Sequence, residues 1–463
     1  MTNYMRRPLI FSAAQQIAYL ERAAAHTLAG WLPKAVAIET KLALGRFLYT
    51  SMDNAVATVR AIQSSSLPLG GWAVALPEGW SAYAAEIDAA SSDVDLLWSL
   101  FADLKVRIRE LSTQLLQRTD PIADVYLRER IEATLRSTES QIAWYQALGL
   151  PVASEERVRT LRALWDARDN GMMKDSAGLV WAPRDRVPSP ARPAHLRHAK
   201  RGSISSHAIY PNNGKHTREM FHRMFDEELT TMELFARCSY EHPDMPEEFH
   251  WAMARQASDE SRHAQMCLDQ LAEFGGQYGD MPISDGVYTF HYQYEPCEPG
   301  SKRELMWRLL LRSAFEEALS LDGFVLQVRK RDFFEEASVS RVLEAIMADE
   351  IHHVRSGWRW STFLNGGDRA KTREELEQAH AWDLKATEDI RRKFVYENQE
   401  EALEELDFVK KRDSFVPKLF PFDLDITLNR VARSAAGMTD EDMAQVVDWG
   451  YVKPDAAATS EQP

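Results

Sequence analysis

Two short segments decide the fold of this chain: DESRH at residues 259–263 and DEIHH at residues 349–353. Both have the pattern D-E-x-x-H, and both lie in stretches whose apolar residues recur at three- and four-residue steps, which predicts α-helices. On a helix, residues i and i+3 lie on one face about a turn apart, so the Glu and the His of each segment can reach one metal ion. A single pattern of this kind is common on helix surfaces, whereas two copies indicate a repeated unit.

Each D-E-x-x-H segment is preceded by another carboxylate at a matching distance. Glu228 lies 32 residues before Glu260, and Glu317 lies 33 residues before Glu350. The surrounding sequences also align, because EELTTMELF around Glu228 matches EEALSLDGF around Glu317. The repeated unit is therefore a pair of helices that offers one Glu and one Glu-x-x-His.

Antiparallel packing of the two helix pairs turns four Glu and two His toward one core. Such a set is what a carboxylate-bridged dinuclear site requires, because four carboxylates offset most of the charge of two divalent ions. Oxygen-rich ligation with one imidazole per metal suits iron or manganese better than zinc. The alternative is an acidic repeat that faces solvent, although charged residues are seldom placed in a packed core without a partner or a metal.

Four further acidic residues are expected to support the ligands. Asp259 and Asp349 each precede a ligand Glu, and each is expected to accept the free ring N–H of a metal-bound imidazole on the opposite segment. The alternative for both is an exposed helix acid. Glu233 and Asp322 occupy equivalent positions of the repeat and are expected to pair with Arg262 or with another buried donor.

Helical patterns extend through most of the chain and predict an all-α fold with a four-helix bundle and an additional N-terminal helical domain. Residues 9–166 are amphipathic nearly throughout, with breaks at the turn signals SSSLPLGG and LGLPVAS. The predicted segments are an N-terminal helical domain at 1–167, a Pro/Gly-rich basic linker at 168–215, the bundle at 216–366 and a C-terminal helical and irregular extension at 367–463.

The bundle is predicted to contain four helices. The first spans 217–241, and the second follows Asp244 and stops at Gly275. The third opens at Ser301 with the S-x-x-E pattern of a capping box. The fourth spans 335–364. The connection between the second and third helices is long enough to cross the bundle.

Two regions outside the bundle have a distinct composition. Between residues 184 and 201 the chain carries six Lys or Arg and one acid, Asp185. The simpler interpretation is a solvated linker that wraps the surface, and the alternative is an anion-binding strap near a pocket. The stretch SFVPKLFPFDLD at 414–425 is irregular, and the last residues, 455–463, are expected to form a disordered tail.

Composition excludes several classes of protein. Hydrophobic residues make up 45% and charged residues 27% of the 463 residues, which excludes disordered, collagen-like and membrane-spanning chains. The net charge of −15 argues against a surface built for nucleic acid or anionic lipid. Three cysteines without framework spacing, no signal peptide and no long apolar run predict a cytoplasmic protein without membrane contact.

The repeated segments resemble the ferritin-like di-iron carboxylate superfamily and, more narrowly, the bacterial family of unknown function DUF455. The resemblance rests on HRMFDEELTTMELF, ASDESRHAQMCLDQLAEFGGQYGDMP, FEEALSLDGF and ADEIHHVRSGWRW, and extends more weakly over the N-terminal half. It implies that the bundle is ferritin-like and holds two metal ions. The ligands that it implies are Glu228, Glu260, His263, Glu317, Glu350 and His353.

Two features bear on this assignment. Glu227 and Glu316 sit beside two of the implied ligands, and the alignment of the two halves favours the second Glu of each pair. The N-terminal half departs from the pattern, because Asp53 and Asn54 are followed by Val56 where a His would be needed. That half is therefore expected to be structural or to form a wall of the substrate pocket.

The resemblance implies an enzyme in which a reduced dimetal centre activates O2. The cofactor would be two Fe, with Mn or a mixed Mn/Fe pair as the alternative. The reaction would be the hydroxylation, desaturation or N-oxygenation of an organic small molecule. The sequence contains no nucleotide-binding fingerprint and no iron–sulfur motif, so electrons are expected from an external donor, from the substrate or from peroxide. The sequence leaves the oligomeric state open, with a homodimer as the commonest alternative among oligomers.

Three other functions remain open at this point. A tRNA-modifying hydroxylase belongs to the same superfamily, but only the basic residues between 184 and 201 favour it and the net charge disfavours nucleic acid. A dimanganese catalase or peroxide scavenger would differ in its metal content and would release O2 from peroxide. A non-catalytic metal-binding protein would lose stability but no turnover on removal of a ligand.

Overall fold

The structure is a computed structural model, and it describes residues 4–64, 79–168, 183–203, 214–322, 337–404 and 427–450. These described residues form helices and connecting segments, with isolated bridges but no strand. The all-α class predicted from the sequence is confirmed. The irregular stretch 414–425 and the predicted tail 455–463 lie outside the described residues.

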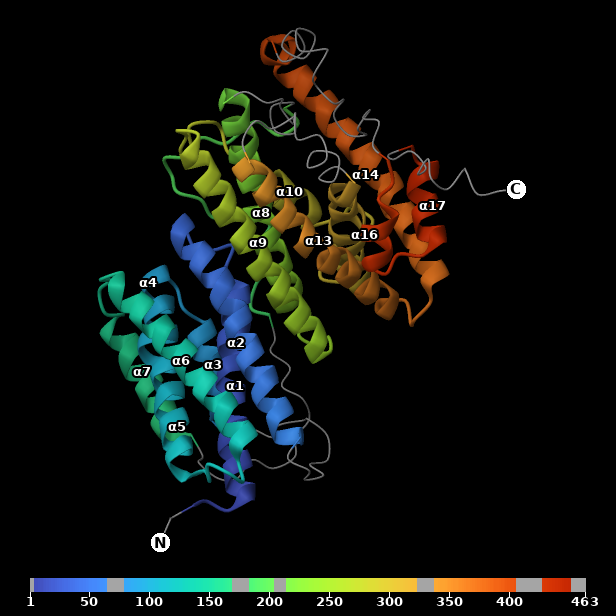
Figure 1. Cartoon of the computed structure of the whole chain (residues 1–463). Helices are drawn as coiled ribbons and strands as arrows, with labels where there is room; N and C mark the ends of the chain where they lie inside the picture. The colour runs from blue at the N-terminus through green and yellow to red at the C-terminus, as the bar shows by residue number, and fades with distance from the viewer. Residues whose placement is uncertain are drawn as a thin grey trace. The chain divides into compact units, whose positions relative to one another are not determined.

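The chain divides into two compact units (Figure 1). Unit 1 comprises Met1–Val187 and Phe235–Ser258, and unit 2 comprises Pro188–Leu234 and Asp259–Pro463. The division falls inside two long helices, α8 (Gly214–Glu241) and α9 (Glu247–Glu273). The four segments predicted from composition stay a prediction, since these units follow contacts in space.

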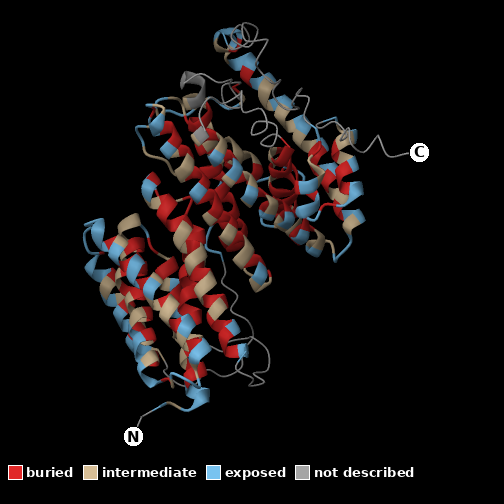
Figure 2. Ribbon diagram, viewed as in Figure 1, coloured by how far each residue is buried: buried red, intermediate tan, exposed pale blue. Residues whose placement is uncertain are grey.

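Unit 1 contains a closed ring of four helices. Each of these helices packs against two of the others, in the order α1, α2, α6, α5 and back to α1. Their buried residues line the inside of the ring (Figure 2). The ring is α1 (Arg7–Trp31), α2 (Ile38–Ser64), α5 (Lys105–Arg118) and α6 (Val125–Ala147). The other elements are α3 (Trp80–Asp88), α4 (Asp93–Leu97), the π-helical segment η1 (Trp98–Leu104) and α7 (Glu155–Ala167).

A buried ion pair lies at the centre of this ring. Nζ of Lys105 is 2.5 Å from Oε2 of Glu21, and it also donates to Oγ of Ser51 at 2.9 Å. Asn54 and Thr138 donate to the other oxygen of Glu21. Burial lowers the pKa of the Lys105 ammonium, although Glu21 counteracts part of this shift. The carboxylate at the centre of unit 1 is therefore hydrogen-bonded and is neutralised by the ammonium group of Lys105.

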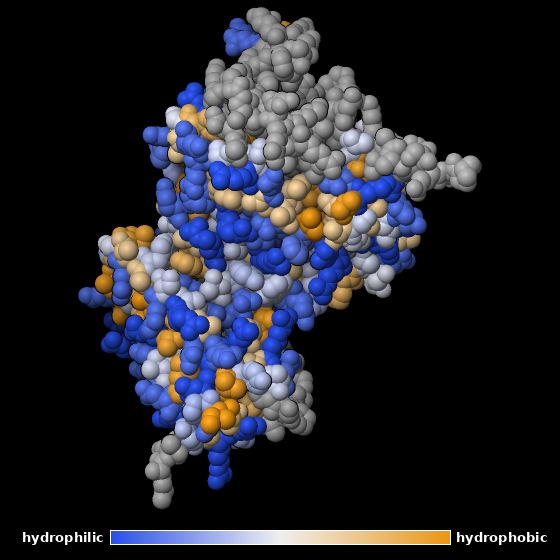
Figure 3. Space-filling model, in the orientation of Figure 1, coloured by the Kyte–Doolittle hydropathy of each residue, from blue (hydrophilic) through white to orange (hydrophobic). Residues whose placement is uncertain are grey.

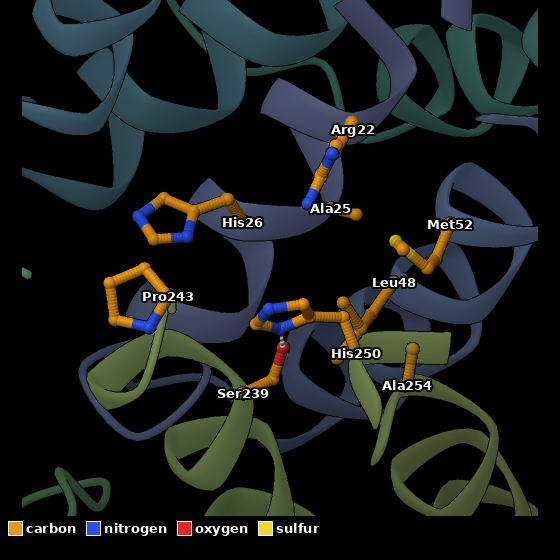
Figure 4. A pocket seen from close by; sticks show the side chains of 9 residues that line it. All are labelled: Arg22, Ala25, His26, Leu48, Met52, Ser239, Pro243, His250 and Ala254. Carbon is orange, nitrogen blue, oxygen red and sulfur yellow. Dashed lines mark hydrogen bonds between the residues drawn. The ribbon is translucent and has the colours of Figure 1, made fainter. Parts of the chain in front are cut away.

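A small pocket of unit 1 lies where α1 and α2 face the end of α8 and the start of α9 (Figure 4). His250 accepts at Nδ1 from Oγ of Ser239, 2.9 Å away, because its Nε2 faces the carbonyl oxygen of Met245 at 3.1 Å. The cavity volume of about 20 Å³ is close to that of one water molecule. We therefore regard this hydrogen bond as a tie between two helices and not as a substrate site.

Unit 2 is built from the first part of α8, the second part of α9 and the elements that follow. These elements are α10 (Gly286–His291), α11 (Lys302–Arg308), the π-helical segment η3 (Leu309–Glu316), α13 (Ala337–Leu364), α14 (Arg369–Glu397), α16 (Arg430–Ala435) and α17 (Asp440–Asp448). The helix of η3 continues through residues 317–322. Buried apolar residues of α11, η3, α13, α14 and α17 share one core.

The helix boundaries in unit 2 agree with the sequence except at the π-helical segment. Oγ of Ser301 accepts from the N–H of Glu304 at 3.1 Å, which caps α11 as predicted. The Glu304 carboxylate accepts from the N–H of Gly300 at 2.8 Å, one residue before the position in a standard capping box. The π-helical turns of η3 are not visible in the hydrophobic pattern, and they directly precede Glu317.

Helix α13 lies against the backbone of η3 at Gly357. A Cβ atom at this position would be 2.8 Å from the amide nitrogen of Ala314 and 2.9 Å from the carbonyl oxygen of Leu309. Only glycine allows two main chains to approach this closely. The contact lies one helical turn after His353, so it fixes the position of that part of α13.

The surface in view is mostly hydrophilic, with apolar side chains in small groups (Figure 3). Among the described residues, no helix is long and apolar enough to cross a membrane. The three cysteines are buried thiols.

Candidate metal centre

The structure brings the six ligands implied by the resemblance together within unit 2. Glu228 comes from α8, and Glu317 comes from the helical residues that directly follow η3. Helices α9 and α13 each supply a Glu and a His. The members of this group, hereafter the Glu/His cluster, are Glu228, Glu260, His263, Glu317, Glu350 and His353. All six are buried, and four buried carboxyl groups at one place require compensating charge.

Glu260 is shared by two sets of ligand atoms, each with all its atoms within 4.8 Å of one another. The sets are Glu228, Glu260, His263 and Glu350, and Glu260, Glu317 and His353. One oxygen of Glu260 lies 3.3 Å from Nδ1 of His263, and the other lies 3.3 Å from Nδ1 of His353. One carboxylate thus faces both imidazoles, which is the arrangement of a bridging ligand.

Glu350 repeats this arrangement from the opposite helix. Its Oε2 is 3.2 Å from Nδ1 of His353, and its Oε1 is 4.0 Å from Nδ1 of His263. The other two carboxylates are terminal: Glu228 is 3.4 Å from Nδ1 of His263, and Glu317 is 4.0 Å from Nδ1 of His353. Each imidazole therefore faces one terminal and two shared carboxylates.

The neighbouring carboxylates have basic partners outside the cluster. Glu227 lies 3.6 Å from Nη2 of Arg223, whereas Glu316 binds Nη1 of Arg312 at 3.1 Å and Nε2 of His291 at 3.1 Å. In both halves it is the following Glu that faces a histidine of the cluster. This is the register that the alignment of the two halves favours.

Two aspartates hold the outer ring nitrogens, and each reaches across to the other helix. Oδ2 of Asp349 is 3.2 Å from Nε2 of His263, and Oδ2 of Asp259 is 3.4 Å from Nε2 of His353. A carboxylate at this position keeps the proton on Nε2 and leaves Nδ1 free for a metal. Both rings therefore present the nitrogen that a metal in the cluster would bind.

The histidines carry protons in the absence of a metal. Burial lowers the pKa of His263, but its hydrogen bonds to Asp349, Glu228 and Glu260 outweigh this effect and leave the pKa well above its usual range. The pKa of His353 is raised in the same way, with Glu350 as the largest opposing cause. Protonated imidazoles thus supply positive charge between the carboxylates.

Two of the four carboxyl groups have raised pKa values, which favour their protonated form. Burial and the charge of Glu350 raise the pKa of Glu317 to about 8. Burial and the charge of Glu228 raise the pKa of Glu260 well above its usual range. Glu228 behaves differently, because its interaction with His263 outweighs burial and lowers its pKa to about 2. In the metal-free cluster, protons on the two histidines and on Glu317 therefore offset the carboxylate charge that metal ions would otherwise neutralise.

Arg312 adds a positive charge that we did not predict from the sequence. Its Nε is 3.9 Å from Oε1 of Glu317, and its Nη2 donates to Oγ1 of Thr231 at 2.9 Å. A signal for it was present, because Arg312 and Arg223 each lie five residues before a ligand Glu. Extending the alignment of the two halves upstream would have identified both arginines.

Glu233 and Asp322 bind arginines from distant segments. Arg192 donates to both oxygens of Glu233, at 2.7 and 2.8 Å, and Arg433 donates to Asp322 at 2.5 Å. The sequence predicted that each acid would pair with Arg262 or with another buried donor. In both cases the partner is another buried donor. These equivalent acids anchor flanking segments to the bundle, one in each half of the repeat.

Loss of the Arg433 side chain is expected to destabilise unit 2 strongly. Both Arg433 and Asp322 are fully buried, so Arg433→Met leaves an unpaired carboxylate in the core and costs about 3–5 kcal/mol in the free energy of unfolding. Urea denaturation measures this loss. Arg430→Met is the matched control, because its exposed pair with Asp440 contributes less than about 1 kcal/mol. Equal effects of both changes would contradict the expectation.

The basic residues between 184 and 201 have carboxylate partners within the chain. Arg192 also binds Asp285 at 2.8 Å, Lys200 lies 2.6 Å from Glu401, and Arg186 lies 3.7 Å from a carboxylate of unit 1. These three of the six basic side chains support the interpretation as a linker fastened to the surface. They leave less positive charge for an external anion, including RNA.

The donor set suits divalent iron or manganese. Oε1 of Glu260 is buried and takes no hydrogen bond of acceptable geometry from any described residue, although Nδ1 of His353 is 3.3 Å away. Such an atom is a ready acceptor for a cation inside the cluster. Four carboxylates and two imidazoles, with no thiolate among them, match hard, oxygen-preferring ions better than a closed zinc site.

Comparison with known proteins places the chain in a family. The model of the family described as "Protein of unknown function (DUF455)" matches residues 152–444, so the chain belongs to this family. The matched range contains the whole Glu/His cluster. No curated protein and no solved structure matches the chain. The helical architecture is compatible with a ferritin-like bundle.

Proposed function

We propose that this protein is an oxidase or oxygenase that binds two iron ions in the Glu/His cluster and uses O2 to oxidise an organic small molecule. The observation that carries the proposal is the sharing of Glu260 between two buried sets of ligand atoms. A mononuclear site would not need a carboxylate whose two oxygens face two imidazoles. Bound iron would supply the redox chemistry with O2, with manganese or a mixed Mn/Fe pair as the alternative.

The side chains of the chain have defined tasks in this proposal. Glu260 and Glu350 would be shared by the two metal ions, while Glu228 and Glu317 would each hold one of them. Asp259 and Asp349 orient the imidazoles through Nε2. Burial of all six side chains keeps bulk water away from the ligands, which would protect a reactive centre from unproductive reactions.

Metal analysis followed by oxygen exposure tests the proposal. Protein produced with iron and manganese present is expected to contain about two iron per chain, and less in His263→Ala and Glu317→Ala. Mixing the anaerobic ferrous protein with O2 is expected to consume O2 and to change the absorbance transiently. A separate electron donor and a small organic substrate are then required for turnover.

Other results would favour other functions. Two manganese with rapid release of O2 from peroxide would indicate a peroxide scavenger. Two metal ions without any reaction with O2 or peroxide would indicate a metal-binding protein without catalysis. A wild-type protein without metal, together with variants that fold normally, would reject the dimetal site altogether.

A further inference from the structure

The outer side of the Glu/His cluster is closed by one arginine. Nη2 of Arg262 lies 2.7 Å from Oδ1 of Asp259 and 2.7 Å from Oδ2 of Asp349. A single nitrogen thus joins a carboxylate of α9 to a carboxylate of α13. The Arg262 side chain is 47% exposed, against 10% and 19% for the two aspartates, so its guanidinium covers them toward solvent.

The two aspartates connect this arginine to both histidines, and the connections cross. Asp349 faces His263 of the other helix, and Asp259 faces His353. The same oxygen of Asp349 contacts both Arg262 and His263. The described contacts therefore form a continuous chain from one imidazole, through one guanidinium, to the other imidazole.

The repeat supplies this arginine only once. The position that matches Arg262 in the second D-E-x-x-H segment is His352, which is exposed. The otherwise matched halves therefore share one cation, which serves both aspartates. The implied metal ligands occur in both halves of the repeat. Arg262 occurs in one half only, and it contacts an aspartate of each half.

We propose that Arg262 is a positioning residue that couples the filling of the two metal positions. An ion that binds Nδ1 of one histidine fixes the ring, and the ring N–H fixes the aspartate that accepts it. The shared guanidinium then fixes the second aspartate and, through it, the second histidine. The entropic cost of ordering falls on the first ion, so the second ion binds an ordered site. The inference rests on the dimetal site of the proposed function.

Titration of the metal-free full-length protein with Mn²⁺ tests this inference by electron paramagnetic resonance. A lone Mn²⁺ ion gives a resolved six-line spectrum, whereas two ions bridged by carboxylates give a broad, coupled one. At one equivalent of Mn²⁺, the wild type is expected to contain mostly empty and doubly filled chains. Arg262→Gln is expected to raise the singly filled fraction roughly threefold or more, since independent sites fill one at a time.

Two further variants separate geometry from charge. Arg359→Gln removes an exposed positive charge from α13 outside the cluster, and it is expected to leave the singly filled fraction unchanged. Arg262→Lys keeps the charge and can donate to both carboxylates, so an intermediate fraction is expected. If Arg262→Gln does not fold, the test rests on Arg262→Lys. A singly filled fraction in Arg262→Lys equal to that of the wild type then overturns the inference.

The outcomes distinguish this inference from the proposed function. Two Mn²⁺ ions bound with equal singly filled fractions in the wild type and in Arg262→Gln overturn the coupling and leave the dimetal site intact. Failure of the wild type to bind two ions overturns both. A rise in the singly filled fraction that occurs equally in Arg359→Gln assigns the effect to charge and also overturns the coupling.

Discussion

Replacement of Glu260 by alanine is expected to remove both metal ions. Because Glu260 belongs to both sets of ligand atoms, its loss takes one ligand from each position and leaves Glu350 to face both imidazoles alone. The content is expected to fall from about two ions per chain to near zero, whereas Glu317→Ala retains about one. Elemental analysis after removal of excess metal measures these values.

A matched control for this experiment lies in the same bundle. Glu227 precedes a ligand Glu but faces Arg223, so Glu227→Ala removes a carboxylate of equal charge without touching the cluster. We expect it to retain two ions per chain. If Glu260→Ala retained one ion, the two positions would not share this carboxylate, and the assignment of Glu260 as a bridge would be wrong.

Metal binding at pH 7 is expected to release roughly three to four protons for every two ions bound. The pKa values of His263 and His353 are raised well above their usual range, and those of Glu260 and Glu317 are also raised, the latter to about 8. Both histidines and Glu317 therefore hold protons at pH 7 in the metal-free protein, and the raised pKa of Glu260 favours its protonated form. Because divalent ions bind the deprotonated forms, acid weakens binding by about a thousandfold for each pH unit near neutrality.

The protonation states also determine how the metal-free protein responds to pH. The two histidines have raised pKa values in the folded state, so their contribution to stability is complete below pH 6.5 and is lost as the pH rises through the raised values.

The number of protons released on metal binding can be measured by isothermal titration with Mn²⁺ in two buffers of different ionisation enthalpy. Absence of release would contradict the assignment of these side chains as ligands, and His263→Ala should release fewer protons.

The sequence was sufficient to predict the helices and the residues of the cluster because the information is local and repeated. A Glu and a His three residues apart define a helix face, and the second copy of the pattern excludes coincidence. The alignment of the two halves pairs Glu228 with Glu317, and both carboxylates lie within 4.0 Å of a histidine of the cluster. The crossing of Asp259 and Asp349 followed from the need to hold the outer nitrogen of each imidazole.

The remaining contacts depend on packing between distant segments. The partner of Asp322 is Arg433, 111 residues away, in a region without any repeat signal. Lys105 and Glu21 lie in ordinary amphipathic helices, where a single charge is normally exposed, and nothing in their local pattern indicates a buried pair. The π-helical turns before Glu317 arise from the way η3 packs, which propensity does not encode.

The close approach at Gly357 sets the distance between α13 and η3, the two elements that lead to one half of the cluster. The main chains of α13 and η3 approach closely there, and Gly357 itself has no side chain that could repack. The separation of these helices, and with it the span from Glu317 to His353, is set by the thickness of two backbones. A side chain at position 357 would force the two main chains apart, so the span between these two ligands depends on this glycine.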